Sequence, residues 1–182
     1  MKHKIKKIGS GGERMKEYSL SLIFEKSIEK NIKDLSKKIK FKNAEPFDNK
    51  SVPHCTLVKW KATSITDEQM KKLNQLIRPV EVIFSGITVL PSRNNEKNGG
   101  YWLEISILKT DQISDLVKKI VQIIGKENVL NEIGDLLRPH VTISRSYDKT
   151  FLLQDIKPDL LRKKVSATPK LGLAGKIFTF YG

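Results

Sequence analysis

A Pro-His-x-Thr pattern occurs twice in this chain, and it constrains the fold more than any other sequence feature. The two copies are Pro53-His54-Cys55-Thr56 and Pro139-His140-Val141-Thr142, and an aliphatic residue follows each of them. The chain has three histidines, so two of the three lie in this repeated context. Strand and helix patterns also recur in similar order around the two copies. We therefore expect two similar halves that each contribute one motif.

The local pattern predicts that each motif begins a β-strand, over about residues 51–60 and 139–146, because a proline leads a run of β-branched and aliphatic residues. Side chains alternate between the two faces of a strand. His54 and Thr56 therefore share one face, and so do His140 and Thr142. If both faces line one cleft, they offer two imidazoles for proton transfer and two hydroxyls that can donate to an oxyanion.

Two other readings of the histidines remain open at this point. A single histidine on a strand is more often a partly buried structural residue, although two matching contexts favour a functional site. A metal site is the next alternative, but neither motif has a cluster of Cys, Asp or Glu beside it. We expect neither a metal nor another cofactor.

The segment Arg138-Pro-His-Val-Thr-Ile-Ser-Arg145 resembles the second motif of the two-histidine (2H) phosphoesterases. The resemblance is to the branch of 2′-5′ RNA ligases and RNA 2′,3′-cyclic phosphodiesterases, the LigT-like proteins. His54-Cys55-Thr56-Leu57 fits the core of the first motif, while 84–91 followed by 101–104 resembles the central hairpin. The resemblance covers residues 15–182 and is weak beyond Thr150.

The resemblance implies a two-lobed, pseudo-symmetric α+β fold whose antiparallel sheets line a central groove, with helices outside. It also implies a metal-independent phosphodiesterase that opens 2′,3′-cyclic phosphates of RNA ends or nucleotides to 2′-phosphates. The reverse reaction, 2′-5′ ligation, would use the same groups. The alternatives are a phosphodiesterase of 2′-5′ oligoadenylates or cyclic oligonucleotide messengers, and a non-catalytic RNA-binding module.

Hydrophobic periodicity and end signals predict the remaining elements. The expected helices are 28–39, capped by Ser27, then 66–77, which opens with the capping box Thr66-Asp-Glu-Gln69, and 111–124, which Gly125 ends. The expected strands are 18–24, 81–90, 101–108, 164–168 and 176–181, with a polar loop over 42–50. A chain of 182 residues can form one such domain with a proper core.

Within the motifs, we expect His140 to act as the base and His54 as the acid, with Thr56 and Thr142 donating to the phosphoryl oxygens. Arg138 has the strand parity of His140 and is a candidate for binding the phosphate.

Five further residues are weaker candidates for substrate binding. Arg145 has the opposite parity to His140, so it reaches the groove only if the strand ends or bulges before it; Lys59 stands in the same relation to His54. The aromatic residues Tyr18, Trp102 and Tyr181 are candidates for stacking a base, with core packing as the default for each.

The charge balance points to a polyanionic partner. The chain carries a formal charge of +14; residues 1–14 hold five basic side chains and one acidic side chain, a net +4, which leaves +10 for residues 15–182. We therefore expect RNA or a nucleotide as the substrate, with a lysine-rich surface that serves only solubility as the alternative. Residues 1–14 are a glycine-rich basic tail that we place outside the domain.

The composition also bears on the compartment. Cys55 is the single cysteine, which excludes an internal disulfide framework. Apolar runs all fall short of the ~20 residues that a membrane span needs. We expect a cytoplasmic protein that does not associate with a membrane and that acts as a monomer.

Overall fold

The computed structural model describes residues 14–38, 44–46, 51–91, 100–147, 160–173 and 179–180. Its strands are β1 (Lys16–Phe24), β2 (Ala44–Pro46), β3 (His54–Ala62), β4 (Val80–Pro91), β5 (Tyr101–Ile107), β6 (His140–Ser146), β7 (Lys164–Leu173) and β8 (Thr179–Phe180). The α-helices are α1 (Lys26–Lys38), α2 (Asp67–Gln75) and α3 (Asp111–Ile124), and two short 3₁₀ turns are η1 (Lys126–Asn128) and η2 (Gly134–Leu136). The predicted α+β class is confirmed.

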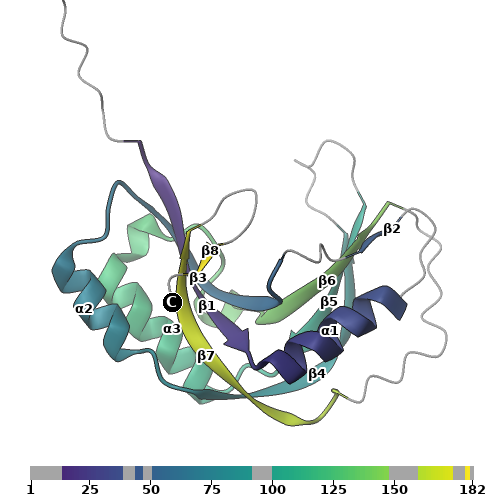
Figure 1. The fold of residues 1–182 in the computed structure, drawn as a ribbon. Coiled ribbons are helices and arrows are strands. Elements are labelled where there is room, and N and C mark those ends of the chain that lie inside the picture. Colours follow the sequence, from purple (N-terminus) through teal and green to yellow (C-terminus); the bar gives the residue numbers. More distant parts are fainter. Residues whose placement is uncertain are drawn as a thin grey trace, which may run out of the picture.

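The described strands form one antiparallel sheet in the order β2-β6-β5-β4-β7-β1-β3, and β8 pairs with β7 (Figure 1). Strand β4 joins the two halves of this sheet. Its residues 80–83 pair with β7, whereas 84–91 pair with β5. The first lobe therefore contains β3, β1 and β7, and the second contains β5, β6 and β2, as the two-lobed prediction requires.

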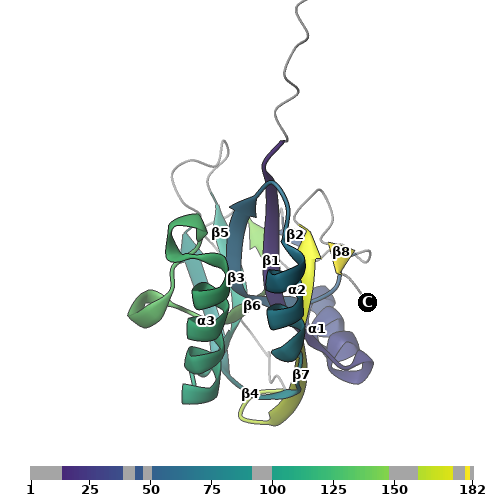
Figure 2. The same cartoon turned by 90° about the vertical axis from the view of Figure 1, so that its left-hand side faces the viewer.

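The helices cross between the lobes. Helix α1 follows β1 in the chain but contacts β6 of the second lobe, and α3 follows β5 but contacts β3 of the first lobe. Helix α2 lies beside α3 on the outer face of the first lobe (Figure 2). Each motif strand is thus backed by a helix from the other half of the chain.

The helix ends follow from the local sequence, with one correction. Thr66 and Gln69 form the predicted capping box of α2, and Gly125, at φ +85°, ends α3 as expected. The predicted cap at Ser27 is wrong, because α1 already begins at Lys26. Helix α3 buries a wide apolar stripe, which consists of Ile113, Leu116, Val117, Ile120 and Ile124.

The core lies behind the motif strands. Cys55, Leu57, Val141 and Ile143 are all fully buried there, on the face opposite the motif histidines and threonines.

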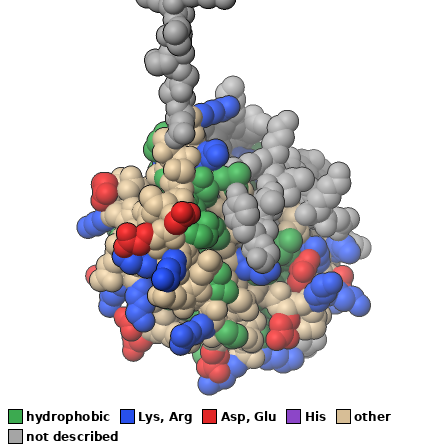
Figure 3. All heavy atoms as spheres, turned by 60° about the vertical axis from the view of Figure 1, so that its left-hand side comes forward, with side chains coloured by type: hydrophobic (Ala, Val, Ile, Leu, Met, Phe, Trp, Pro, Cys, Tyr) green, Lys and Arg blue, Asp and Glu red, His purple; other side chains and the backbone are tan. Residues whose placement is uncertain are grey.

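The surface shown in Figure 3 carries acidic and basic side chains interspersed with one another, so this side of the molecule is not a patch of a single charge. Of the helices described, none combines the length and the apolar character that crossing a bilayer requires.

Besides β3, which covers 54–62 instead of 51–60, two strands differ from the prediction and a third is described only in part. Strand β2 lies within the expected loop 42–50 and pairs antiparallel with β6, where its Pro46 is tolerated because β2 is an edge strand. Strand β7 runs on to Leu173, since it pairs with β1 along 167–173 as well as with β4. The described part of the predicted terminal strand is β8, which pairs with the end of β7.

Candidate active site

The two motif strands meet although they lie far apart in the order of the sheet. β3 ends that order and β6 is second in it, yet the two strands contact each other. The buried Cys55 thiol hydrogen-bonds the backbone of His140, and the charge of His140 acts on His54. The curved sheet therefore brings His54, Thr56, His140 and Thr142 together, and we call the surface that carries them the motif face.

Both imidazoles are oriented by the same local contact. His54 Nδ1 lies 2.8 Å from the carbonyl oxygen of Val52, and His140 Nδ1 lies 2.8 Å from that of Arg138. A carbonyl oxygen only accepts, so Nδ1 carries the hydrogen in both rings. In a neutral ring the lone pair is then on Nε2, and each histidine is only partly buried. Burial, together with the charge of His140, lowers the pKa of His54.

The first-lobe hydroxyl, that of Thr56, is held by a buried pair of serines on β1. Ser21 Oγ donates to Thr56 Oγ1 at 3.4 Å and lies 3.3 Å from Ser19 Oγ. Both serines are fully buried, which fixes the position of the hydroxyls. Strand β1 lies between β3 and β7, and Ser21 pairs with Lys170 on β7 as well as with Thr56 on β3. This half-buried lysine therefore also belongs to the motif face.

A β-bulge follows each motif at the equivalent position. On β3, Thr56 pairs with Ser21 and Val58 with Leu20, so Leu57 is an extra residue. On β6, Thr142 pairs with Glu104 and Ser144 with Leu103, so Ile143 is the extra residue. An extra residue reverses the alternation of side chains. The condition that the sequence set for Lys59 and Arg145 is therefore met.

The bulges place Lys59 and Arg145 on the motif face. The guanidinium carbon of Arg145 lies 4.9 Å from the ring centres of both Trp102 and Tyr147. Trp102 pairs with Arg145 across β5 and β6, so the predicted aromatic candidate is brought to the site. Lys59 Nζ lies 2.7 Å from a carboxylate oxygen of Glu17, and this contact lowers the pKa of Glu17.

Side chains from outside the two motif strands hold both bulges. Asn131 Nδ2 donates to the Leu57 carbonyl at 3.1 Å, and its Oδ1 accepts from the Lys59 N–H at 2.7 Å. On the other strand, Ser36 Oγ from α1 donates to the Ile143 carbonyl at 2.6 Å. The carbonyl of each bulged residue is thus satisfied by a side chain, which stabilises the local geometry.

Glu104 is a site residue that the sequence reasoning missed. It is 4% exposed on β5, with Oε2 2.9 Å from Arg138 Nη1 and Oε1 3.2 Å from His140 Nε2. The signal was a single carboxylate inside the apolar run Leu103-Glu104-Ile105, because a buried acid requires a partner. Arg138 therefore lies at the site, as its parity predicted, and it binds this carboxylate.

The aromatic candidates separate. Tyr18 is 7% exposed and stacks on Trp60 at 5.8 Å, on the apolar side of β1, so the prediction of a base-stacking role for it is wrong and core packing holds. Alternation explains this, because Tyr18 shares its face with Leu20 and not with Ser19 or Ser21. The candidate Tyr181 lies outside the described residues.

The described side chains form no obvious metal centre. In the ranges given above, no three or more residues among His, Cys, Asp and Glu come together in a way that would hold a metal ion. The chemistry that the motif face itself offers is acid–base catalysis by imidazole and hydrogen-bond donation by threonine and cationic side chains.

Comparisons with protein-family models and with curated proteins give no match to this sequence. Solved structures do match over most of their length. TT0787 of Thermus thermophilus has a TM-score of 0.60 at 13% identity, over 91% of this chain and 95% of that one. E. coli LigT in complex with NADP⁺ has a TM-score of 0.60 at 14% identity, over 93% and 96%. Kluyveromyces marxianus Usb1 has a TM-score of 0.50 at 16% identity, over 91% and 97%. The chain therefore shares the fold of these solved structures, as its resemblance to the 2H phosphoesterases led us to expect.

Proposed function

We propose that the chain is a metal-independent 2H phosphodiesterase that opens 2′,3′-cyclic phosphates of RNA ends or nucleotides to 2′-phosphates. One observation carries the proposal: two His-x-Thr pairs lie on one face, and the histidine Nδ1 of each pair lies on a backbone carbonyl, which makes Nε2 the nitrogen that would exchange protons. The solved structures of E. coli LigT with NADP⁺, with 3′-AMP and with ATP support a nucleotide as the substrate.

The reaction needs groups of the kind that the motif face carries. A water oxygen bonds to phosphorus as the bond from phosphorus to the 3′ oxygen breaks. One imidazole takes a proton from the water and the other gives a proton to the departing 3′ oxygen. Thr56 and Thr142 donate to the non-bridging oxygens, where negative charge accumulates in the transition state.

The second candidate substrate is a 2′-5′-linked oligonucleotide, and one feature of the motif face suits any oligonucleotide, an RNA end included. Lys59 and Arg145 lie five residues beyond the two histidines, on the same face. Strands rise ~3.3 Å per residue, so these cations stand on the order of 15 Å from the histidines along their strands. A substrate with several phosphates or bases can reach them, whereas a mononucleotide at the histidines cannot reach both.

The purified chain, assayed in EDTA, tests the proposal with three substrates: a cyclic mononucleotide, a 2′-5′ oligoadenylate and a cyclic dinucleotide. We expect turnover of the first to a 2′-phosphate, identified by phosphorus NMR. His54→Ala and His140→Ala should each lower the rate by ~10²–10⁴-fold with the fold retained.

The third histidine supplies the matched control, because His3→Ala lies in the basic tail and should leave the rate unchanged. Activity that EDTA abolishes and zinc restores would contradict the metal-free mechanism. Binding of RNA without turnover of any of the substrates would favour the non-catalytic RNA-binding module.

A further inference from the structure

The two halves of the site differ in the residue that lies opposite the motif threonine on the neighbouring strand. The residue that pairs with the motif threonine is Ser21 in the first lobe and Glu104 in the second. We propose that Glu104 is a positioning residue that makes the two histidines unequal, so that His140 delivers the proton and His54 receives one. This inference rests on the proposed phosphodiesterase function.

Hydrogen-bond geometry supports the assignment for His140. Its ring lies between two acceptors, the Arg138 carbonyl at 2.8 Å from Nδ1 and the Glu104 carboxylate at 3.2 Å from Nε2. A neutral imidazole has one hydrogen and satisfies only one acceptor. The second hydrogen is shared by Nε2 and Oε1, and the pair stores it as a unit. This stored proton is the one available to the 3′ oxygen.

Glu104 is held in place to serve this role. The carboxylate is almost completely buried, and Arg138 fixes its other oxygen at 2.9 Å. Four charged or titratable groups surround His140: Glu104 on β5 contacts its ring, Arg138 before β6 binds Glu104, His54 lies on β3, and the buried Cys55 thiol of β3 contacts its backbone. Glu104 alone among these is an anion, so it decides which proton state is favoured.

His54 has the opposite setting. Ser21, a neutral residue, takes the place that Glu104 has in the other lobe, and it donates to Thr56. Burial and the nearby charge of His140 lower the pKa of His54, which keeps that ring neutral. Because Nδ1 donates to Val52, the lone pair of the neutral ring is on Nε2. His54 is therefore ready to accept a proton from water.

The catalytic cycle then has a direction, and it reverses the roles that we expected from sequence. His54 Nε2 takes a proton from water as the new oxygen–phosphorus bond forms. His140 Nε2 gives its proton to the 3′ oxygen as that bond to phosphorus breaks. Solvent then removes the proton from His54 and restores it to the His140–Glu104 pair.

Sulfur in place of the 3′ oxygen gives a direct test of the roles, because a thiolate leaves without an acid. Glu104→Gln and His140→Ala should lower kcat by ~10²-fold or more on the cyclic phosphate but far less on its 3′-thio analogue. His54→Ala should be equally harmful on both substrates. If sulfur instead rescues His54→Ala and leaves His140→Ala inactive, the assignment of roles is overturned. This comparison needs only the two histidine variants, so it decides the roles even where Glu104→Gln does not fold.

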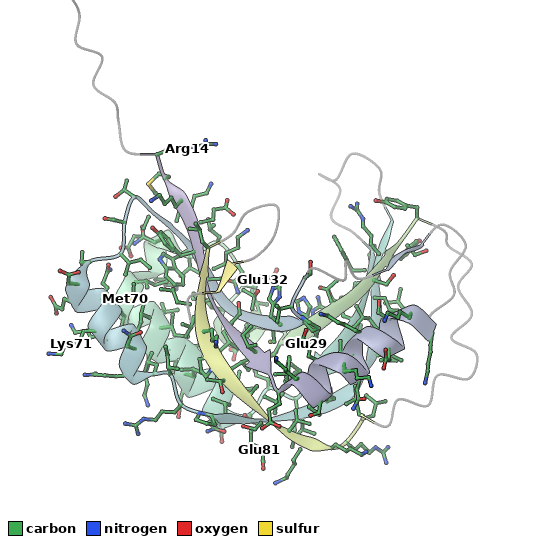
Figure 4. All side chains as sticks on the ribbon, in the orientation of Figure 1. Arg14, Glu29, Met70, Lys71, Glu81 and Glu132 are labelled. Atoms are coloured by element: carbon green, nitrogen blue, oxygen red, sulfur yellow. The ribbon has the colours of Figure 1, made fainter. Side chains whose placement is uncertain are left out.

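The matched control is Glu81→Gln, which removes one carboxylate far from the site. Glu81 pairs with Lys164 at 3.0 Å and points away from the molecule (Figure 4). In Glu104→Gln, but not in Glu81→Gln, the basic limb of the kcat–pH profile should move to lower pH, and NMR should show the His140 ring losing its proton at lower pH.

The NMR measurement separates this inference from the proposed function. A shift in the His140 titration without turnover of any substrate would retain the Glu104 pairing and reject the phosphodiesterase. Turnover with Glu104→Gln indistinguishable from Glu81→Gln, in both the pH profile and the spectrum, would retain the enzyme and reject the role of Glu104.

Discussion

Ser36→Ala should destabilise the protein through the bulge that it supports. Ser36 is 2% exposed on α1, and its hydroxyl donates to the Ile143 carbonyl at 2.6 Å. Alanine leaves this buried carbonyl without its hydroxyl donor, which costs about 1–3 kcal/mol. Alanine also has the higher helix propensity and returns about 0.5 kcal/mol. The free energy of unfolding should therefore fall by about 0.5–2.5 kcal/mol, and Tm by about 1–10 °C for a chain of this size.

The assay is urea unfolding followed by circular dichroism and by tryptophan fluorescence. The two tryptophans report on different lobes, since Trp60 lies on β3 and Trp102 on β5. The control is Ser114→Ala on α3, where the lost hydroxyl bond is a local one to the Thr110 carbonyl at 3.0 Å. The m-value should stay unchanged in both variants, because neither changes the surface exposed on unfolding.

The same substitution should also affect function, because the bulge at Ile143 turns Arg145 to the motif face. We expect KM for an oligonucleotide to rise in Ser36→Ala while kcat on a cyclic mononucleotide changes little. The reasoning is refuted if Ser36→Ala is as stable as Ser114→Ala and binds the oligonucleotide as the parent protein does. The bulge would then form without the hydroxyl.

Two further predictions concern charge. Affinity for a single-stranded oligoribonucleotide should fall with salt concentration with a log–log slope of about −0.7 per phosphate contact, whereas affinity for a cyclic mononucleotide should hardly change. Lys59→Ala and Lys170→Ala should reduce the slope, and deletion of residues 1–14 should preserve most of it. An equally shallow salt dependence for both substrates would mean that the positive charge serves solubility. The lowered pKa of His54 means that the folded protein disfavours the charged form of this ring, so the acidic limb of the rate profile should lie below pH ~6.5. As the pH falls below ~6.5, the unfolded chain binds the proton before the folded protein does, and the contribution of His54 to the free energy of unfolding is lost. An acidic limb centred above pH 7 would contradict the proposed role of His54.

Local pattern predicted the parts of the site that depend on one strand. Alternation from each histidine gave the faces of Thr56 and Thr142 correctly, and it placed Tyr18 beside Leu20, where the structure has it. Strict alternation gives the wrong face only beyond the motifs, at Lys59 and Arg145. Lys59 and Arg145 depend on bulges whose carbonyls are bonded by side chains 74 and 107 residues away in sequence. Contacts at such separations leave no periodic signal in the segment that they shape.

Glu104 escaped prediction for a related reason. Its position in β5 was visible, but its role follows from the pairing of β5 with β6, which sets Glu104 opposite Thr142 and beside His140. Sequence gives the faces of a strand and not the identity of its neighbour. The charge that distinguishes the two histidines was therefore apparent only once the strands were placed side by side.

The buried thiol behind the first motif can report the local opening of strand β3. Cys55 is the single cysteine, it is fully buried, and burial raises the pKa of its thiol to about 12. Only about 10⁻⁴ of such a thiol is ionised at pH 8, so a disulfide reagent reacts when β3 separates from its surroundings and not before. The rate of that reaction measures the free energy of local opening at the motif strand. A nucleotide bound to both histidines should hold β3 against β6 and slow the labelling, so that binding could be measured without turnover.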